Sequence, residues 1–157
     1  MYQYIFSFFS AIISPEVINM EKGLLYFLNG NVQMGLLSTR HMTEICPDQR
    51  LRRSLLEDLH AYEKFENAII NLRDENNPVK GLSNMSQRNT EMAINMKTMM
   101  NKDTDKLRDM LAKGYEKGIA SIHENLQKAE NEREDVKELA EGYLMFMKQT
   151  HAKYKGF

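Results

Sequence analysis

Four methionines are spaced so that several of their thioether sulfurs could meet on one face of a helix. They are Met92, Met96, Met99 and Met100. Thioethers are soft ligands that suit Cu(I), so this spacing is compatible with a soft-metal site. No His or Cys lies nearby to complete such a site, and flexible Met side chains commonly pack a short helix or a partner surface instead. We expect the packing role and keep the copper site as the alternative.

The remaining residue types that could do chemistry form no catalytic constellation. Cys46 directly precedes Pro47 and would lie at the start of a helix, where the helix dipole can lower the pKa of a thiol; more commonly such a Cys is a small, partly buried residue. The histidines show no i, i+4 pairing and no neighbouring Ser or Cys nucleophile, so we expect them on the surface or flanking the core: His41, His60, His123 and His151. We therefore expect no catalytic residues and favour a protein that is not an enzyme.

The elements that would position these side chains are expected to be helices. The chain has 157 residues, with only three Pro, eight Gly and no Trp, and it is rich in Leu, Met, Ala, Glu and Lys, as helical domains are. The 21 basic residues are balanced by 22 acidic ones, so a basic face that binds nucleic acid is not expected. A single Cys permits no intrachain disulfide, which favours a reducing, cytoplasmic location.

Residues 1–19 form an apolar N-terminal extension. The run from Met1 to Ser14 is shorter than the roughly 20 apolar residues that span a bilayer, and no Lys or Arg precedes it as in a signal peptide. The codons for residues 15–19 can carry a purine-rich bacterial ribosome-binding site just before a start codon at Met20. We expect native translation to begin there, so that the extension is not part of the native protein. Membrane association through the apolar run is the less favoured alternative.

An internal repeat organises the rest of the chain. One set of matching residues lies 83 positions apart: Leu24 and Leu107, Leu28 and Leu111, Gly35 and Gly118, Leu36 and Ile119, and Ser38 and Ser121. A second set lies 85 positions apart: Leu51 and Val136, Leu55 and Ala140, and Leu59 and Leu144. The larger second offset is expected if each half is a helical hairpin and the second hairpin has a loop two residues longer.

Apolar residues recur at three- and four-residue steps in four segments, which predicts four long helices within a single domain over residues 20–157. The first hairpin spans 21–74, and Pro47 divides it into helices over 21–45 and 47–74, because Pro ends one helix and suits the first position of the next. A crossover over 75–103 leads to the second hairpin, which spans 104–155. Its first helix spans 104–128, and its second helix follows an acidic turn.

The predicted inner faces are mostly aliphatic and aromatic. The aromatic residues Tyr115, Tyr143, Phe146, Tyr154 and Phe157 lie on or near these faces and are expected in the core rather than around a ligand. The second helix is predicted to bury Leu51, Leu55, Leu59, Tyr62, Phe65, Ile69 and Leu72, and the fourth helix Val136, Leu139, Tyr143, Met147, Thr150 and Tyr154.

Two glycines at equivalent positions of the repeat predict a close approach between helices. Gly30 and Gly35 each cost a helix roughly 1 kcal/mol relative to Ala. Gly35 recurs as Gly118, so both halves carry this cost at the same level. The simplest account is that a second helix packs closely against each of these two positions.

Short motifs in the first hairpin resemble the ferritin-like superfamily. Leu28-Asn29, followed by Gln33 and Met34-Gly35, looks like the first helix of small ferritin-like bundles. The segment 46–51, CPDQRL, is similar to the DPELR-type turn that opens their second helix. The resemblance covers the chain from Met20 onward, and it implies an all-α four-helix bundle of two repeated antiparallel helical hairpins joined by a long crossover.

The resemblance also implies where metal ligands would lie. The family holds two metal ions with a Glu from each of two helices and a Glu-x-x-His from each of the other two. Glu57 and His60 match the Glu-x-x-His spacing, and Glu116 lies 83 positions after Gln33, at its place in the repeat. The first-helix Glu is missing, and Glu138 and Glu141 have no His three residues later. Only part of the ligand set is therefore present.

These observations predict a ferritin-like bundle that has lost its metal ligands, binds no cofactor and acts through its surfaces, as a homo-oligomer or with a protein partner. The alternative is an iron or manganese protein of the oxidase or storage type that uses a degenerate site at Glu57, His60 and Glu116. Fold resemblance alone cannot supply a substrate, partner or biological process.

Overall fold

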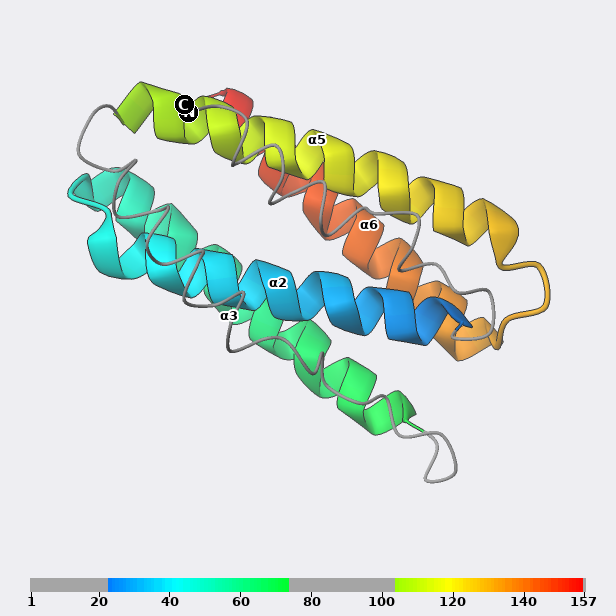
Figure 1. Cartoon of the computed structure of the whole chain (residues 1–157). Coiled ribbons are helices and arrows are strands. Elements are labelled where there is room, and N and C mark those ends of the chain that lie inside the picture. The colour runs from blue at the N-terminus through cyan, green and yellow to red at the C-terminus, as the bar shows by residue number, and fades with distance from the viewer. Residues whose placement is uncertain (1–22, 74–103, 157) are drawn as a thin grey trace.

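The computed structural model describes residues 23–73 and 104–156, and this part of the chain is entirely helical. Its four helices are α2 (Gly23–Ile45), α3 (Gln49–Leu72), α5 (Thr104–Lys128) and α6 (Glu134–Lys155), with no strand among the described residues (Figure 1). The prediction of an all-α four-helix bundle is confirmed at this level. The N-terminal extension, the crossover and the four methionines from Met92 to Met100 lie outside the described residues.

The junction between α2 and α3 lies two residues later than predicted. Pro47 and Asp48 precede α3, because the carboxylate of Asp48 caps the helix by accepting a hydrogen bond of 2.7 Å from the Leu51 N–H. An acidic side chain at this position satisfies one of the unpaired N–H groups of the first turn. The first turn of α6 contains Glu134 and Asp135, which suits the positive end of the helix dipole.

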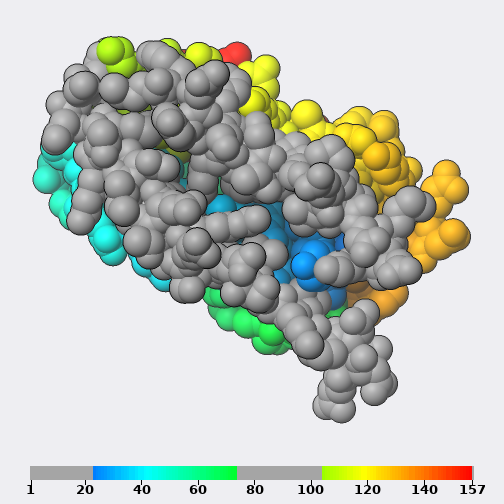
Figure 2. Space-filling model, in the orientation of Figure 1, coloured from blue at the N-terminus to red at the C-terminus, as the bar shows by residue number. Residues whose placement is uncertain are grey.

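The helices associate as two neighbouring pairs that share one core. α2 packs along α3, α5 packs along α6, and the pairs meet through α3 with α6, α2 with α6 and α2 with α5 (Figure 1). Figure 2, in the same orientation, shows α3 side chains along the lower edge and α5 side chains along the upper edge. The largest fully buried side chains are Tyr143, Leu28, Leu51, Leu55, Ile69, Ile122, Val32 and Val136.

The two halves of the repeat bury equivalent positions. In the set 83 positions apart, Leu24 and Leu107, Leu28 and Leu111, and Ser38 and Ser121 are all buried. In the set 85 positions apart, Leu51 and Val136 and also Leu55 and Ala140 are buried, whereas Leu59 and Leu144 are both half-buried. The two remaining pairs differ, because Leu36 and Gly118 are buried whereas Ile119 and Gly35 are half-buried. The repeat in the sequence therefore corresponds to a repeat in burial at most of its positions.

The two repeated glycines each lie against a side chain of the neighbouring helix. A Cβ at Gly35 would collide with the ring of Tyr62 on α3. A Cβ at Gly118 would lie 2.5 Å from the terminal methyl of Met147 on α6. Tyr62 and Met147 are themselves 85 positions apart and touch at the centre of the bundle, with the Tyr62 hydroxyl 3.8 Å from the Met147 sulfur.

The turn between α5 and α6 contacts the start of α2 and the end of α3. The Leu24 N–H, at the start of α2, donates to the carboxylate of Glu132 at 3.1 Å. The Arg133 guanidinium donates to the carbonyl of Leu72, the last residue of α3, at 3.2 Å. One short turn thus satisfies a donor at one helix end and an acceptor at another.

Within the described ranges, no helix combines the length and the apolar character that crossing a bilayer requires.

Candidate functional site

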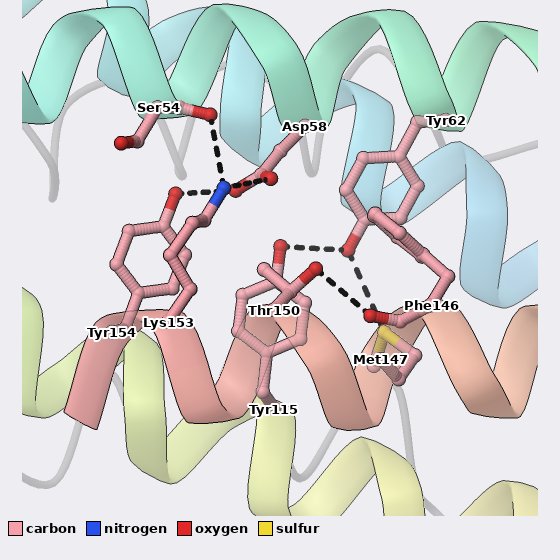
Figure 3. Close-up of polar contacts among 9 residues, drawn as sticks. All are labelled: Ser54, Asp58, Tyr62, Tyr115, Phe146, Met147, Thr150, Lys153 and Tyr154. Atoms are coloured by element: carbon pink, nitrogen blue, oxygen red, sulfur yellow. Dashed lines mark hydrogen bonds and ion pairs between the residues drawn. The ribbon is translucent and has the colours of Figure 1, made fainter. Parts of the chain in front are cut away.

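The most distinctive feature of the core is a buried carboxylate on α3. Asp58 is only 3% exposed, and both of its oxygens are engaged by consecutive residues of α6 (Figure 3). Its Oδ1 lies 2.5 Å from the Lys153 ammonium, and its Oδ2 accepts a hydrogen bond from the Tyr154 hydroxyl. Lys153 also reaches the Ser54 carbonyl at 3.4 Å. The end of α6 is therefore tied to the first half of α3 by charge and hydrogen bonding.

A second polar contact lies one turn further along α3. The hydroxyls of Tyr62 and Tyr115 are 3.2 Å apart, which joins α3 to α5 across the core (Figure 3). The ring of Tyr115 stacks on that of Tyr154, with centroids 5.8 Å apart and an interplanar angle of 24°. This stacking connects the tyrosine pair to the hydroxyl that donates to Asp58.

A third polar contact involves α2, the one helix not yet mentioned. The Tyr143 hydroxyl on α6 donates to the side-chain carbonyl of Asn31 on α2 at 2.7 Å. The ring of Phe65 meets that of Tyr143 edge-on at a centroid distance of 5.0 Å. All four helices therefore contribute polar side chains to the interior, and we call this set the polar core: Asn31, Asp58, Tyr62, Tyr115, Tyr143, Lys153 and Tyr154.

Burial sets the protonation of the polar core. Burial raises the pKa of the Asp58 carboxyl, and the hydrogen bonds from Lys153 and Tyr154 oppose that rise. Burial also raises the pKa of Tyr62, Tyr115, Tyr143 and Tyr154 above the ordinary phenol value. The four phenols are consequently neutral hydrogen-bonding groups at neutral pH and not phenolate nucleophiles or ligands.

This donor set does not fit the di-metal site that the ferritin-like resemblance implies. Such a site uses several carboxylates and two His side chains that point inward. The polar core contributes one carboxylate, Asp58, and both of its oxygens already bind protein groups. The other members are neutral phenols, an amide and an ammonium. What the arrangement does is join the four helices by internal hydrogen bonds and ring stacking, although the buried Asn31 Nδ2 has no hydrogen-bond partner.

The residues predicted as metal ligands lie on the surface. Glu57 and His60 on α3 and Glu116 on α5 are all exposed. His60 Nδ1 lies 3.7 Å from Glu63 Oε2 one turn later, so its nearest acidic neighbour is on its own helix. Among residues 23–73 and 104–156, no three or more His, Cys, Asp or Glu side chains cluster in a way that could hold a metal ion.

Cys46 has the environment of an unreactive thiol. It is buried, and burial raises the pKa of the thiol above its ordinary value. Its sulfur lies 3.6 Å from the Asp48 carbonyl, to which the S–H donates. The thiolate form that a nucleophile or metal ligand needs is therefore disfavoured.

Sequence reasoning placed the four tyrosines of the polar core on inner faces but missed Asn31, Asp58 and Lys153, of which Asp58 is the buried charge. Leu59 was expected on the inner face of α3, but it is half-buried and Asp58 is buried in its place. The signal was present in the spacing. Asp58 lies three residues after Leu55 and four before Tyr62, which continues the alternating steps of the buried stripe. An acidic residue in that phase is a candidate for a buried, paired charge.

Comparison with protein-family models, with curated proteins and with solved structures finds no match to this chain.

Proposed function

We propose that this chain is a ferritin-like bundle of two antiparallel helical hairpins that acts as a structural or interaction protein, in an oligomeric form, rather than as a catalyst. The direction of the contacts supports the hairpins. Gln33 on α2 donates to Glu66 on α3 at 2.7 Å. Gly35, which follows Gln33 on α2, contacts Tyr62, which precedes Glu66 on α3. Contacts that advance along one helix and go back along the other indicate an antiparallel pair.

One observation carries the non-catalytic part of the proposal. The only carboxylate side chain that is buried among the described residues, Asp58, has both oxygens bound by Lys153 and Tyr154. A catalytic or metal-binding interior needs a group with free lone pairs or an available proton. Because these three groups satisfy each other, the described interior offers no free buried carboxylate to a metal ion or substrate, and we assign the function to the outer faces.

The test is the metal content of protein that has been purified without chelator, loaded with Fe(II) or Mn(II), and desalted. Elemental analysis by mass spectrometry is expected to find far less than one equivalent per chain. The matched variants are Glu57→Ala with His60→Ala, which removes the exposed pair, and Asp58→Asn, which removes the buried carboxylate. Stoichiometric iron or manganese in the wild type that either variant abolishes would overturn the proposal and revive the oxidase or storage alternative.

A further inference from the structure

The outward face of α6 carries an apolar residue that the bundle does not use. Met145 is 61% exposed, more than the other exposed large hydrophobic residues of the described chain, Leu56 at 50% and Ile70 at 46%. It projects away from the buried side of α6, which is formed by Val136, Ala140, Tyr143, Met147, Thr150 and Tyr154. An isolated exposed Met is ordinary on a protein surface, so its neighbours decide whether it has a role.

The decisive neighbour is Gly142, one turn before Met145. A Cβ at Gly142 would meet nothing within 4 Å, unlike those at Gly35 and Gly118, which would meet the adjacent helix. A glycine within a helix lowers helix stability, and no described residue lies in the open space beside it. The face therefore presents a projecting side chain and, three residues before it, a position without a side chain, which we call the notch.

These two features complement each other across a two-fold axis. When two copies of α6 cross in opposite directions about an axis between Gly142 and Met145, each Met145 meets the Gly142 of the other copy. This is the isologous arrangement of a symmetric dimer, in which residue i contacts residue j and residue j contacts residue i. A methionine side chain is flexible enough to fill such a notch.

The charges along the face have the pattern that this arrangement needs. The exposed residues Glu138 and Glu141 precede Met145, and the exposed Lys148 follows it. In the antiparallel pair, the acidic turn of each copy faces Lys148 of the other, whereas a parallel pair would place like charges together. None of these three side chains forms an ion pair with another residue in the described part of the chain.

From this geometry we infer that the outward face of α6 binds a second copy of this chain, forming a symmetric dimer centred on Met145 and Gly142. The inference rests on the proposed role as an interaction protein and names its partner. The contact runs from Glu138 to Gln149, about 17 Å of helix at 1.5 Å per residue. That is short for a protein interface, so we expect a weak dimer in the micromolar range.

The experiment is sedimentation equilibrium of the full chain over a concentration series from low micromolar to sub-millimolar. The wild type is expected to move from the 18.4 kDa of one chain toward twice that mass. Met145→Glu places a carboxylate against the acidic turn of the partner and is expected to weaken association at least tenfold. Leu56→Glu, which changes a comparably exposed residue on α3, is the matched control and is expected to leave association unchanged.

A second variant separates loss of binding from loss of folding. Gly142→Leu has open space in the single chain and favours the helix, so its melting temperature is expected to be unchanged or higher. It nevertheless fills the notch and is expected to abolish the dimer. The charge reversals Glu141→Lys and Lys148→Glu should each weaken association, and the double reversal should restore it.

Two outcomes would overturn the inference. One is a wild type that stays monomeric at every concentration. The other is a dimer that survives Met145→Glu and Gly142→Leu but is lost with Leu56→Glu, which would move the interface to α3. A monomeric wild type would also contradict the oligomeric form proposed above, but neither outcome bears on the non-catalytic part of that proposal, which is decided by metal content.

Discussion

The two helix pairs bury the same positions with different chemistry. In the first pair, α3 places Asp58 and Tyr62 in the interior. At the equivalent positions 85 residues later, α6 places Tyr143 and Met147. The first pair thus contributes a charge and a rigid ring, and the second contributes a neutral phenol and a flexible thioether. The repeat therefore sets which positions are buried, but the side chain at each position sets how much a change there costs.

The largest difference is expected at the paired glycines. In Gly35→Ala, the new methyl collides with the ring of Tyr62, which is held by Phe146 at a centroid distance of 5.1 Å and by the Tyr115 hydroxyl. Forcing extra volume into such a contact costs about 2 to 3 kcal/mol, and we expect that loss in the free energy of unfolding measured with urea.

Tyr62→Met sharpens this test because it gives α3 the residue type that α6 has at the equivalent position, Met147. The Gly35→Ala, Tyr62→Met double variant is expected to be more stable than the sum of the two single losses predicts, because Met can move out of the way. A strictly additive double variant would contradict the proposed collision.

The next largest effect is expected at the ion pair that joins Asp58 of the first helix pair to Lys153 of the second. Lys153→Met leaves Asp58 as a buried carboxylate with Tyr154 as its remaining partner. Removing one member of a buried pair strands the other, and because Lys153 is partly exposed we expect a loss of about 2 kcal/mol at pH 7. The loss should shrink at acidic pH, where Asp58 is protonated. An equal loss at both pH values would show that Lys153 acts through packing alone.

Asp58→Asn tests whether the ionisation of Asp58 raises or lowers the unfolding free energy as the pH changes. Burial raises the pKa of Asp58 in the folded chain above its ordinary 3.8, so ionising the group costs more in the folded chain than in the unfolded chain. Its favourable contribution is complete below the unfolded pKa and is lost as the pH rises through the folded pKa. We expect the unfolding free energy of the wild type to fall relative to Asp58→Asn as the pH rises from the ordinary pKa of 3.8 through the raised pKa of the folded chain, measured by urea titration at each pH.

A smaller effect is expected at the equivalent residue of the second pair. Tyr143→Phe removes the hydroxyl that donates to Asn31 and leaves the amide carbonyl without that partner. The expected loss is about 1 kcal/mol. Unlike the loss from Lys153→Met, it should not change between acidic and neutral pH, because no group with a pKa in that range is involved.

The smallest effect is expected at the second glycine. In Gly118→Ala, the new methyl meets only the terminal methyl of Met147, which can rotate away. Ala also favours the helix over Gly by roughly 1 kcal/mol, so the net change in unfolding free energy should stay within about 1 kcal/mol of zero. A loss as large as that of Gly35→Ala would show that the two glycine contacts are equally rigid.

Much of the helical architecture could be predicted from residue spacing. The periodic stripes locate α2, α3 and α5, and their predicted ends lie within two residues of those observed. The start of α3 was misplaced because the carboxylate of Asp48, and not Pro47, begins the helix. Helix ends depend on which side chain satisfies the free N–H groups, and periodicity does not contain that information.

The polar core was harder to predict because its contacts join distant residues. Asp58 meets Lys153 and Tyr154 only after α3 and α6 have packed together, and nothing local to Asp58 indicates those partners. The predicted ligands failed to converge for a simpler reason. Glu57 precedes Asp58 by one residue, and one residue rotates a helix by about 100°. That rotation separates a solvated carboxylate from a buried one.

The turn between α5 and α6 has a consequence for the order in which the chain acquires its structure. The first N–H of α2 that it satisfies belongs to Leu24, and the acceptor, Glu132, is made 108 residues later. On the ribosome, the beginning of α2 and the end of α3 must therefore wait for almost the whole chain to emerge. Until then, the Leu24 amide hydrogen should exchange with solvent at nearly the rate of an unfolded peptide, although the middle of α2 can already be protected.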